Sequence, residues 1–331
     1  MKIRVLAALA ILLCAIPAGA AQKRRVSRST ALKAETVNNP KLRTVVGPRS
    51  SGSAVLRAQI LLDRAHFSVG EIDASYGANM RYAVKAYQAA HGLPDRGIVN
   101  AQTWEALNSD MGPVLAPYTI ADPDLAHPFE KIPADMVEKS KLKALGYESP
   151  LEELGERFHT NPRLLEKLNP GKSFDKSGEE ILAPQVERPH VAEKVAKVLV
   201  SEADHSVEAL DAQDKVIARY PATMGSEHDP LPVGDWKLHK PLKNPNFYYN
   251  PDLFWDANET QAKATIKPGP NNPVGVVWIG LSKEHYGIHG TPEPSTIGKT
   301  QSHGCIRLTN WDAEELAGMI TPGITATLRK E

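Results

Sequence analysis

Cysteine is scarce in this sequence, and neither sign of charge is in surplus. Only Cys14 and Cys305 occur among the 331 residues. Cys14 lies in a segment that we expect to be removed, so no intramolecular disulfide can form afterwards. Lys plus Arg and Asp plus Glu both number 39, and no cluster of cations appears beyond the N-terminal tail. Binding to nucleic acid is therefore not expected.

Long apolar runs are also missing, apart from one near the N-terminus. Val5–Ile16 follows two cations and precedes the small residues 18–20, which is the pattern of a cleaved secretory signal. The run is too short for a stable helix across a bilayer. We therefore expect residues 1–20 to be a signal peptide and the mature protein to lie in the periplasm or cell envelope, with no transmembrane segment after processing. A retained membrane anchor is the alternative.

Composition and periodicity divide the rest of the chain into a linker and three domains. Residues 21–52 are rich in Lys and Arg, and they bury too little apolar surface to fold alone, so we expect a basic flexible linker. Domains are expected at residues 53–109, 115–188 and 193–329. A chain of 331 residues is long enough for this number of domains.

The pattern of residues 53–109 predicts three short helices around a small core. Asn79 is expected to cap the second helix, and Gly92 to end it. The segment resembles the peptidoglycan-binding type 1 domain, which implies binding to the cell wall; a role as a spacer is the alternative. The resemblance rests on residues 55–59, 70–73, 83–88, 92–94 and 103–104.

Residues 115–188 predict an α+β module with the order strand, helix, helix, strand. Tyr118–Ile120 and Glu180–Pro184 have the character of strands, and the apolar residues between Leu151 and Leu168 fit two short helices. This order resembles a LysM glycan-binding module. Residues 121–148, however, form a Pro- and charge-rich insertion that the family usually lacks. Carbohydrate binding and a purely structural role both stay open.

Residues 193–329 predict a mainly-β, sandwich-like domain, because many short strands accompany one clear helix. Asn310 is expected to cap that helix. The aromatic-rich segment Asn244–Pro273 predicts a lid or a binding loop, since so long a connection is unusual within a compact domain. Strands are expected at residues 195–200, 206–210, 216–220, 274–281 and 324–328.

Cys305 is the candidate nucleophile of this last domain. A lone unpaired thiol in an exported protein needs a reason, and Ser302 and Gly304 beside it favour reactivity over an inert, buried cysteine. A free thiol is mostly protonated at neutral pH, and a histidine is the natural base. His289 and His303 compete for that role. The amides of Gly304 and Cys305 are placed to stabilise an oxyanion.

These residues match the signature of a known family. The last domain resembles the L,D-transpeptidase catalytic (YkuD) domain, whose signature is a His-Gly pair followed by Ser/Thr-His-Gly-Cys, a hydrophobic residue, and Asn or Arg. The matching residues are His289, Gly290, Ser302, His303, Gly304, Cys305, Ile306 and Arg307, with the upstream loop 230–234.

The resemblance implies a role for each of these residues. Cys305 would be the nucleophile and His289 the proton donor and acceptor, while the carbonyl of Gly290 would orient the His289 ring. His303 and Gly304 would shape the oxyanion pocket. Arg307, where many members carry Asn, could hold a substrate carboxylate or stabilise the thiolate; a surface salt bridge is the alternative.

The implied reaction is a two-step acyl transfer on peptidoglycan, without a cofactor. Cys305 would attack the stem-peptide carbonyl before the terminal D-alanine and form a thioester. The acyl group would then pass to an amine of another stem, or to a lysine of an envelope protein. Water as the acceptor would make the enzyme an L,D-carboxypeptidase. The implied partners are stem tetrapeptides as donor and acceptor, and carbapenems as inhibitors.

Two alternatives come from other classes of protein. A zinc hydrolase would use His285, His289, His303 and Cys305 as ligands, but no Glu stands near them as in the H-E-x-x-H pattern. A non-catalytic cell-wall-binding protein, with Cys305 as a relic, is the other alternative.

Overall fold

A computed structural model describes residues 32–110, 112–255, 257 and 261–331. The described residues fall within one compact unit. The expected signal peptide, the long apolar run inside it and Cys14 lie outside the described residues. Within the described part of the chain, no helix is both long enough and apolar enough to cross a membrane.

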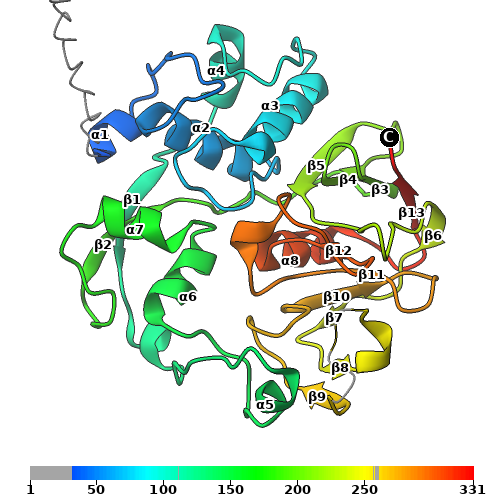
Figure 1. The fold of residues 1–331 in the computed structure, drawn as a ribbon. Helices are drawn as coiled ribbons and strands as arrows, with labels where there is room; N and C mark the ends of the chain where they lie inside the picture. The colour runs from blue at the N-terminus through cyan, green and yellow to red at the C-terminus, as the bar shows by residue number, and fades with distance from the viewer. Residues whose placement is uncertain (1–31, 111, 256, 258–260) are drawn as a thin grey trace, which may run out of the picture. The chain divides into compact units, whose positions relative to one another are not determined.

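The N-terminal helical part contains α1 (Ala34–Val37), α2 (Ser53–Arg64), α3 (Ala78–Ala90) and α4 (Ala101–Leu107) (Figure 1). Amphipathic patterns on the last three bury one core, in which Trp104 is fully enclosed. Val37 on α1 and Val46 also lie in this core, so the described end of the predicted linker packs with it.

One predicted cap in this part is wrong. Helix α3 begins at Ala78 after Gly77, and its N-cap position makes no side-chain hydrogen bond. The Asn79 amide instead donates to the carbonyl of Ile297, at 2.9 Å. Tertiary contact thus overrides the local preference of Asn for a cap.

The middle module runs from β1 (Leu115–Thr119) to β2 (Glu180–Pro184), which pair antiparallel. Between them lie α6 (Pro150–Arg157) and α7 (Pro162–Leu168), so the predicted order of strand, helix, helix and strand is observed. Each of these helices begins with a proline behind a capping Ser or Asn, as expected for the first turn of a helix. The predicted insertion contains η1 (Asp122–Leu125) and α5 (Met136–Ser140).

The C-terminal β domain contains two main sheets, as the predicted sandwich requires. The order of the five-stranded sheet is β5-β4-β3-β13-β6, and that of the four-stranded sheet is β12-β11-β10-β7. Side chains of both sheets meet in one apolar core. The strands are β3 (Lys197–Ser201), β4 (Ser206–Leu210), β5 (Val216–Pro221), β6 (Gly234–Lys237), β7 (Leu242–Lys243), β10 (Val277–Gly280), β11 (Gly287–His289), β12 (Ile306–Arg307) and β13 (Thr325–Arg329).

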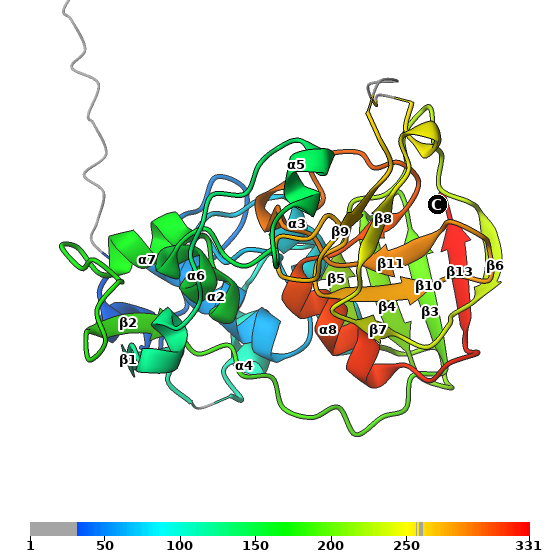
Figure 2. The same cartoon turned by 90° about the horizontal axis from the view of Figure 1, so that it is seen from below.

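Helix α8 (Asn310–Met319) lies against β10 and β11 (Figure 2). The cap predicted at Asn310 is wrong by one position. Thr309 is the N-cap, and its hydroxyl accepts the backbone N–H of Asp312. The side chain of Asn310 is therefore free of the capping role and reaches towards the neighbouring loops.

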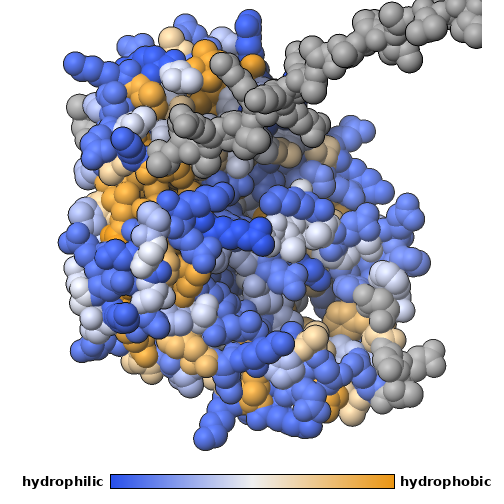
Figure 3. Space-filling view, turned by 60° about the vertical axis from the view of Figure 1, so that its left-hand side comes forward, coloured by the Kyte–Doolittle hydropathy of each residue, from blue (hydrophilic) through white to orange (hydrophobic). Residues whose placement is uncertain are grey.

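The segment predicted as a lid forms a hairpin of β8 (Phe247–Tyr249) and β9 (Ala264–Ile266), with η2 (Pro251–Leu253) between them. Another 3-10 turn, η3 (Pro294–Thr296), follows β11. Tyr248 and Trp255 are among the large hydrophobic side chains that stay exposed. On the face drawn in Figure 3, hydrophobic residues lie in patches within a largely hydrophilic surface.

A buried group of charges around Arg188, called here the Arg188 cluster, joins the three parts. Arg188 Nη2 lies 2.6 Å from Asp63 of α2 and 2.8 Å from Asp312 of α8, and Nη1 pairs with Glu315 of α8. His159, which follows α6, lies 2.9 Å from Asp63. Because these carboxylates are withdrawn from water, they depend on Arg188 for compensation of their charge.

Candidate active site

Strands β11 and β12 carry the two halves of the candidate active site. They pair in parallel, with Ile288 opposite Ile306 and His289 opposite Arg307. Paired residues of neighbouring strands point to the same face of a sheet, and successive residues alternate between faces. Ile288 and Ile306 are fully buried in the core, so His289 and Arg307 face the other side. Cys305 comes immediately before β12.

The imidazole of His289 is held in one orientation. Its Nδ1 lies 2.6 Å from the carbonyl oxygen of Gly290, and because a carbonyl only accepts, Nδ1 carries the proton and Nε2 the lone pair. The ring of Trp278 stacks on it with centroids 5.4 Å apart, because the two residues are direct partners across β10 and β11. The ring is thereby preset as a base.

Burial keeps His289 neutral. The side chain is 4% exposed. Burial, followed by the charge of Arg307, lowers the pKa of His289 to about 3. At neutral pH the imidazole therefore holds no extra proton and can accept one.

Cys305 is protonated at rest but accessible. The thiol is partly exposed, and its Sγ donates to the carbonyl oxygen of His285, at 3.6 Å. Burial raises the pKa of the Cys305 thiol, while the N–H of Gly287 and the charge of Arg307 oppose that shift. The candidate pair is thus a neutral thiol and a neutral imidazole.

The turn before Cys305 depends on Gly304. Its φ of +89° lies in the left-handed region, and a Cβ there would come within 2.7 Å of the Tyr286 ring. Ser302 stabilises the same turn through two hydrogen bonds. Its hydroxyl donates to the carbonyl of Cys305 at 2.6 Å, and its backbone N–H donates to the carbonyl of Gly225 at 3.0 Å. A residue with a side chain at position 304 would shift the thiol.

His303 contacts aromatic residues between β8 and β9. Its ring contacts Phe254 at a centroid distance of 5.1 Å and Trp255 at 5.8 Å. The hairpin predicted as a lid thus reaches the segment that carries the thiol. The carbonyl of Gly290 fixes the orientation of the His289 ring, and the choice of His289 over His303 as the base stays a prediction.

The four ligands of the zinc alternative do not converge. His285 is exposed and its nearest charged partner is Glu284, at 3.6 Å. Among the described residues, no group of three or more His, Cys, Asp and Glu side chains could hold a metal ion.

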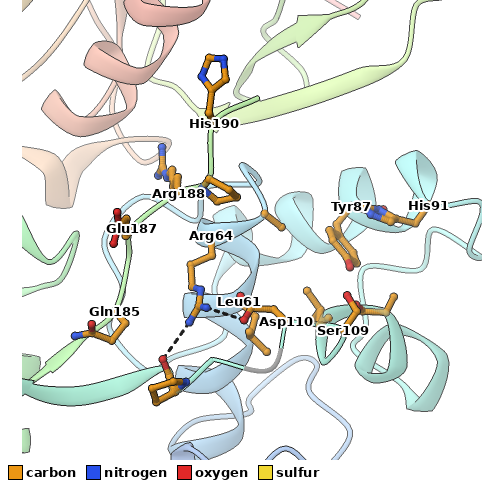
Figure 4. A pocket seen from close by; sticks show the side chains of 15 residues that line it. Leu61, Arg64, Tyr87, His91, Ser109, Asp110, Gln185, Glu187, Arg188 and His190 are labelled. Atoms are coloured by element: carbon orange, nitrogen blue, oxygen red, sulfur yellow. Dashed lines mark hydrogen bonds and ion pairs between the residues drawn. The ribbon is translucent and has the colours of Figure 1, made fainter. Parts of the chain in front are cut away.

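A large open pocket of about 840 Å³ lies elsewhere, among residues of α2, α3, α4 and the segment 185–190 (Figure 4). Inside it, Arg64 donates to Asp110 at 2.6 Å and to the carbonyl of Pro113 at 3.1 Å. None of the predicted site residues lines this pocket. It is therefore separate from the thiol.

Three residues at the site were not predicted from the sequence. Trp278 could have been predicted as a site residue. Side chains alternate along a strand, so Trp278 points to the face of the sheet away from the apolar core residues Val277 and Ile279. Asn310 and Glu156, which contact each other beside the Gly290 loop, lack such a signal. They lie on α6 and α8, and no local sequence pattern predicts that these two helices are in contact.

The C-terminal β domain thus combines two sheets, a His-Gly pair at the end of β11, and a Ser-His-Gly-Cys turn before the parallel neighbour β12. Residues 196–328 match the family model of the L,D-transpeptidase catalytic domain, YkuD. Residues 51–107 match the model of a peptidoglycan binding domain. The chain therefore carries an L,D-transpeptidase catalytic domain behind a peptidoglycan-binding domain.

Relatives named as L,D-transpeptidases are similar to this chain. YkuD of Bacillus licheniformis is 28% identical over 180 residues, which are 54% of this chain and 92% of the relative. YkuD of Bacillus subtilis is 29% identical over 160 residues, 46% of this chain and 77% of the relative. A solved L,D-transpeptidase of Xylanimonas cellulosilytica aligns with a TM-score of 0.37 and 16% identity, covering 88% of this chain and all of that one.

Proposed function

We propose that this protein is an exported peptidoglycan L,D-transpeptidase in which Cys305 is the nucleophile and His289 the general base. The observation that carries the proposal is the His289 ring, neutral and fixed by the Gly290 carbonyl, on the strand that pairs with the one following Cys305. An oriented imidazole on the strand next to the one that the thiol precedes is the arrangement that we propose for nucleophilic catalysis.

The first step forms the acyl-enzyme. As Cys305 Sγ attacks the stem-peptide carbonyl before the terminal D-alanine, His289 Nε2 takes the thiol proton. The C–S bond forms, the C–N bond to D-alanine breaks, and His289 returns the proton to the leaving amine. A thioester on Cys305 remains.

The second step transfers the acyl group. An acceptor amine attacks the thioester, His289 takes a proton from that amine, and Cys305 leaves as a thiol. An amine of another stem gives a cross-link, and a lysine of an envelope protein gives an anchored protein. Phe254 and Trp255 pack on His303, two residues from Cys305, and closure of these side chains over the bound acyl group would exclude water and favour an amine.

The motif residues support the transition state in this proposal. The amides of Gly304 and Cys305 stabilise the oxyanion, which is worth about a hundredfold to a thousandfold per donor. His303 shapes that pocket, and Ser302 holds its backbone through the carbonyl of Cys305. The Arg307 charge, which opposes protonation of His289 and favours the thiolate, is also suited to a substrate carboxylate.

The preceding parts deliver the enzyme to its substrate. Residues 1–20 direct export, residues 21–52 link the signal to the fold, and residues 53–109 bind the cell wall. Residues 115–188, with a LysM-like order of elements, act as a second module, and residues 193–329 do the chemistry.

Product analysis tests this function. The purified protein is incubated with disaccharide-tetrapeptide, and the products are separated by mass. We expect loss of D-alanine together with a stem–stem dimer. Tripeptide alone would identify an L,D-carboxypeptidase, and binding to sacculi without any conversion would identify a non-catalytic wall protein.

Replacing the base should slow catalysis strongly. In His289→Gln we expect kcat to fall by about a hundredfold or more, because general acid–base catalysis typically contributes about 10²–10⁴-fold to the rate. Alkylation of Cys305 by iodoacetamide should slow as well. His190→Gln is the matched control, since His190 is exposed and lies at the pocket that is separate from the thiol, and wild-type rates are expected there. Equal rates in wild type and His289→Gln would contradict the assignment.

A carbapenem should acylate Cys305. Incubation with meropenem is expected to add one drug mass to the protein, located on the peptide that contains Cys305. Prior alkylation of the thiol should prevent the addition. An adduct that forms on the alkylated protein would show that another residue reacts.

A further inference from the structure

The backbone of Gly290 is held by its N–H bond to the Val277 carbonyl, at 3.2 Å, and by close packing against the side chain of Asn310. A Cβ at Gly290 would lie 2.2 Å from Asn310 Oδ1, and one at Gly275 would lie 2.0 Å from it. The amide oxygen is thus wedged between two glycine backbones, and it accepts the N–H of Val276 at 3.3 Å. The loop that orients His289 therefore rests on the Asn310 amide.

Asn310 is in turn held by a carboxyl group from the middle module. Its Nδ2 lies 2.9 and 3.1 Å from the two carboxyl oxygens of Glu156 on α6, and 3.2 Å from the carbonyl of Pro270. Tyr147 donates to Glu156 Oε2 at 3.4 Å. The amide can hardly rotate, since both of its ends are engaged.

Residues 145–152 of the middle module, close to Glu156 in sequence, hydrogen-bond to the loop that leads into β10. Leu145 donates its N–H to Pro268 at 2.9 Å and accepts that of Asn271 at 3.0 Å. The Asn271 amide donates to Glu152 at 2.8 Å. A Cβ at Gly269 would collide with the Leu145 carbonyl, at 2.0 Å, so the two backbones are in close contact.

The insertion that sets this module apart from a LysM unit also reaches the hairpin. Asp135, the N-cap of α5, accepts the Gln261 amide at 2.7 Å. Gln261 accepts the hydroxyl of Tyr249 on β8, at 2.6 Å. The middle module thus contacts both the β8–β9 hairpin and the loop that leads into β10. The inserted residues therefore have a structural role in docking the module on the catalytic domain.

We propose that Glu156 is a positioning residue for His289, acting through Asn310 and the Gly290 loop, so that full catalysis requires the middle module to be docked on the catalytic domain. This inference rests on the proposed role of His289 as the base. It predicts that a change in a different module lowers the rate of the chemical step.

The test compares Glu156→Ala with Glu156→Gln and with the control Glu153→Gln, using kcat and KM for disaccharide-tetrapeptide. Misplacement of the base should lower kcat of Glu156→Ala about tenfold, with KM within about twofold. Glu156→Gln should recover most of the activity, because its amide oxygen can still accept from Asn310. Glu153 pairs with Arg157 on the same helix and makes no contact with Asn310, so its variant should match wild type.

A double-mutant cycle distinguishes a shared chain of contacts from two independent losses of stability. Asn310→Ala should lower kcat as Glu156→Ala does, and the double variant should be no slower than either one, because both break the same chain of contacts. The rate of Cys305 alkylation against pH should change in both single variants and not in Glu153→Gln.

Three results would overturn the inference: wild-type kcat in Glu156→Ala, equal loss in the Ala and Gln variants, or additive effects in the cycle. An inactive wild-type protein would instead contradict the proposed function itself, so the two failures are distinguishable.

Discussion

Cys305→Ala should abolish the release of D-alanine from tetrapeptide, with turnover lower by about a thousandfold or more. The reason is that no other cysteine is present among the described residues, so nothing else there can form the thioester. The measurement is the rate of D-alanine release at saturating substrate, followed by coupled oxidation.

Cys305→Ser is the informative companion to that variant. It keeps the shape of the side chain, but its hydroxyl is far less acidic than a thiol, and a neutral His289 is a weak base for it. We expect turnover at least about a hundredfold below wild type, with unchanged circular dichroism and melting temperature. Release of D-alanine at the wild-type rate by the Ala variant would remove Cys305 from the mechanism.

Arg188→Leu should cause a large loss of stability, although Arg188 lies away from the active site. Removing one partner of a buried ion group leaves the others uncompensated, which costs about 3–5 kcal/mol. The free energy of unfolding in urea, followed by circular dichroism, measures it. Arg64→Leu is the control, because Arg64 pairs with the part-exposed Asp110 and the carbonyl of Pro113, and its loss of stability should stay near or below about 1 kcal/mol.

The same cluster predicts how stability depends on pH. Although burial alone would raise it, Arg188 and then His159 lower the pKa of Asp63 to about 2 from an ordinary 3.8. A depressed carboxyl pKa stabilises the fold above the unfolded value and ceases to do so as pH falls through the folded value. Wild type should therefore lose about 2 kcal/mol between roughly pH 4 and 2.

In Arg188→Leu this acid-dependent loss should shrink, because Asp63 no longer has its main cation. An identical slope in the two proteins, or a stability loss in Arg188→Leu no greater than in Arg64→Leu, would contradict the role assigned to the Arg188 cluster.

Local patterns sufficed for most of the strands. The predicted strand 206–210 is observed with the same bounds as β4, and 216–220 is observed as β5 with one further residue. Short runs of apolar and β-branched residues bounded by turn residues, such as those at 211–215 between these two strands, are a local property of the sequence. The strand predicted at 274–281 is observed only from Val277 to Gly280. Before it, the backbone of Gly275 packs against Asn310 and Gly290.

The caps were predicted less well, because several polar residues in a row satisfy the same local rule. Thr309 and Asn310 both suit an N-cap, and the choice between them follows from the wedge that Asn310 forms beside Gly290. In α3 the amide of Asn79 goes to Ile297, a residue 218 positions further along the chain. A contact between residues so far apart in the chain cannot be predicted from a local sequence pattern.

The candidate site was predictable where its chemistry lies in short motifs. Cys305, His289 and Gly290 stand in such motifs, and the hydrogen bond from His289 to Gly290 has the predicted partners. The residues alone left His289 and His303 as competing bases, because a sequence does not show which ring a backbone carbonyl orients or which strand lies beside it. Glu156 could not be predicted, since it belongs to a module that meets the site only in the folded chain.

Intact-protein mass spectrometry of the acyl-enzyme tests the central claim most directly. The protein is mixed with disaccharide-tetrapeptide in the absence of a second amine and quenched in acid within seconds. We predict a mass increase equal to the substrate minus D-alanine, located on the peptide that contains Cys305 and absent from Cys305→Ala. Release of D-alanine with no adduct on Cys305 would contradict a covalent mechanism on this thiol.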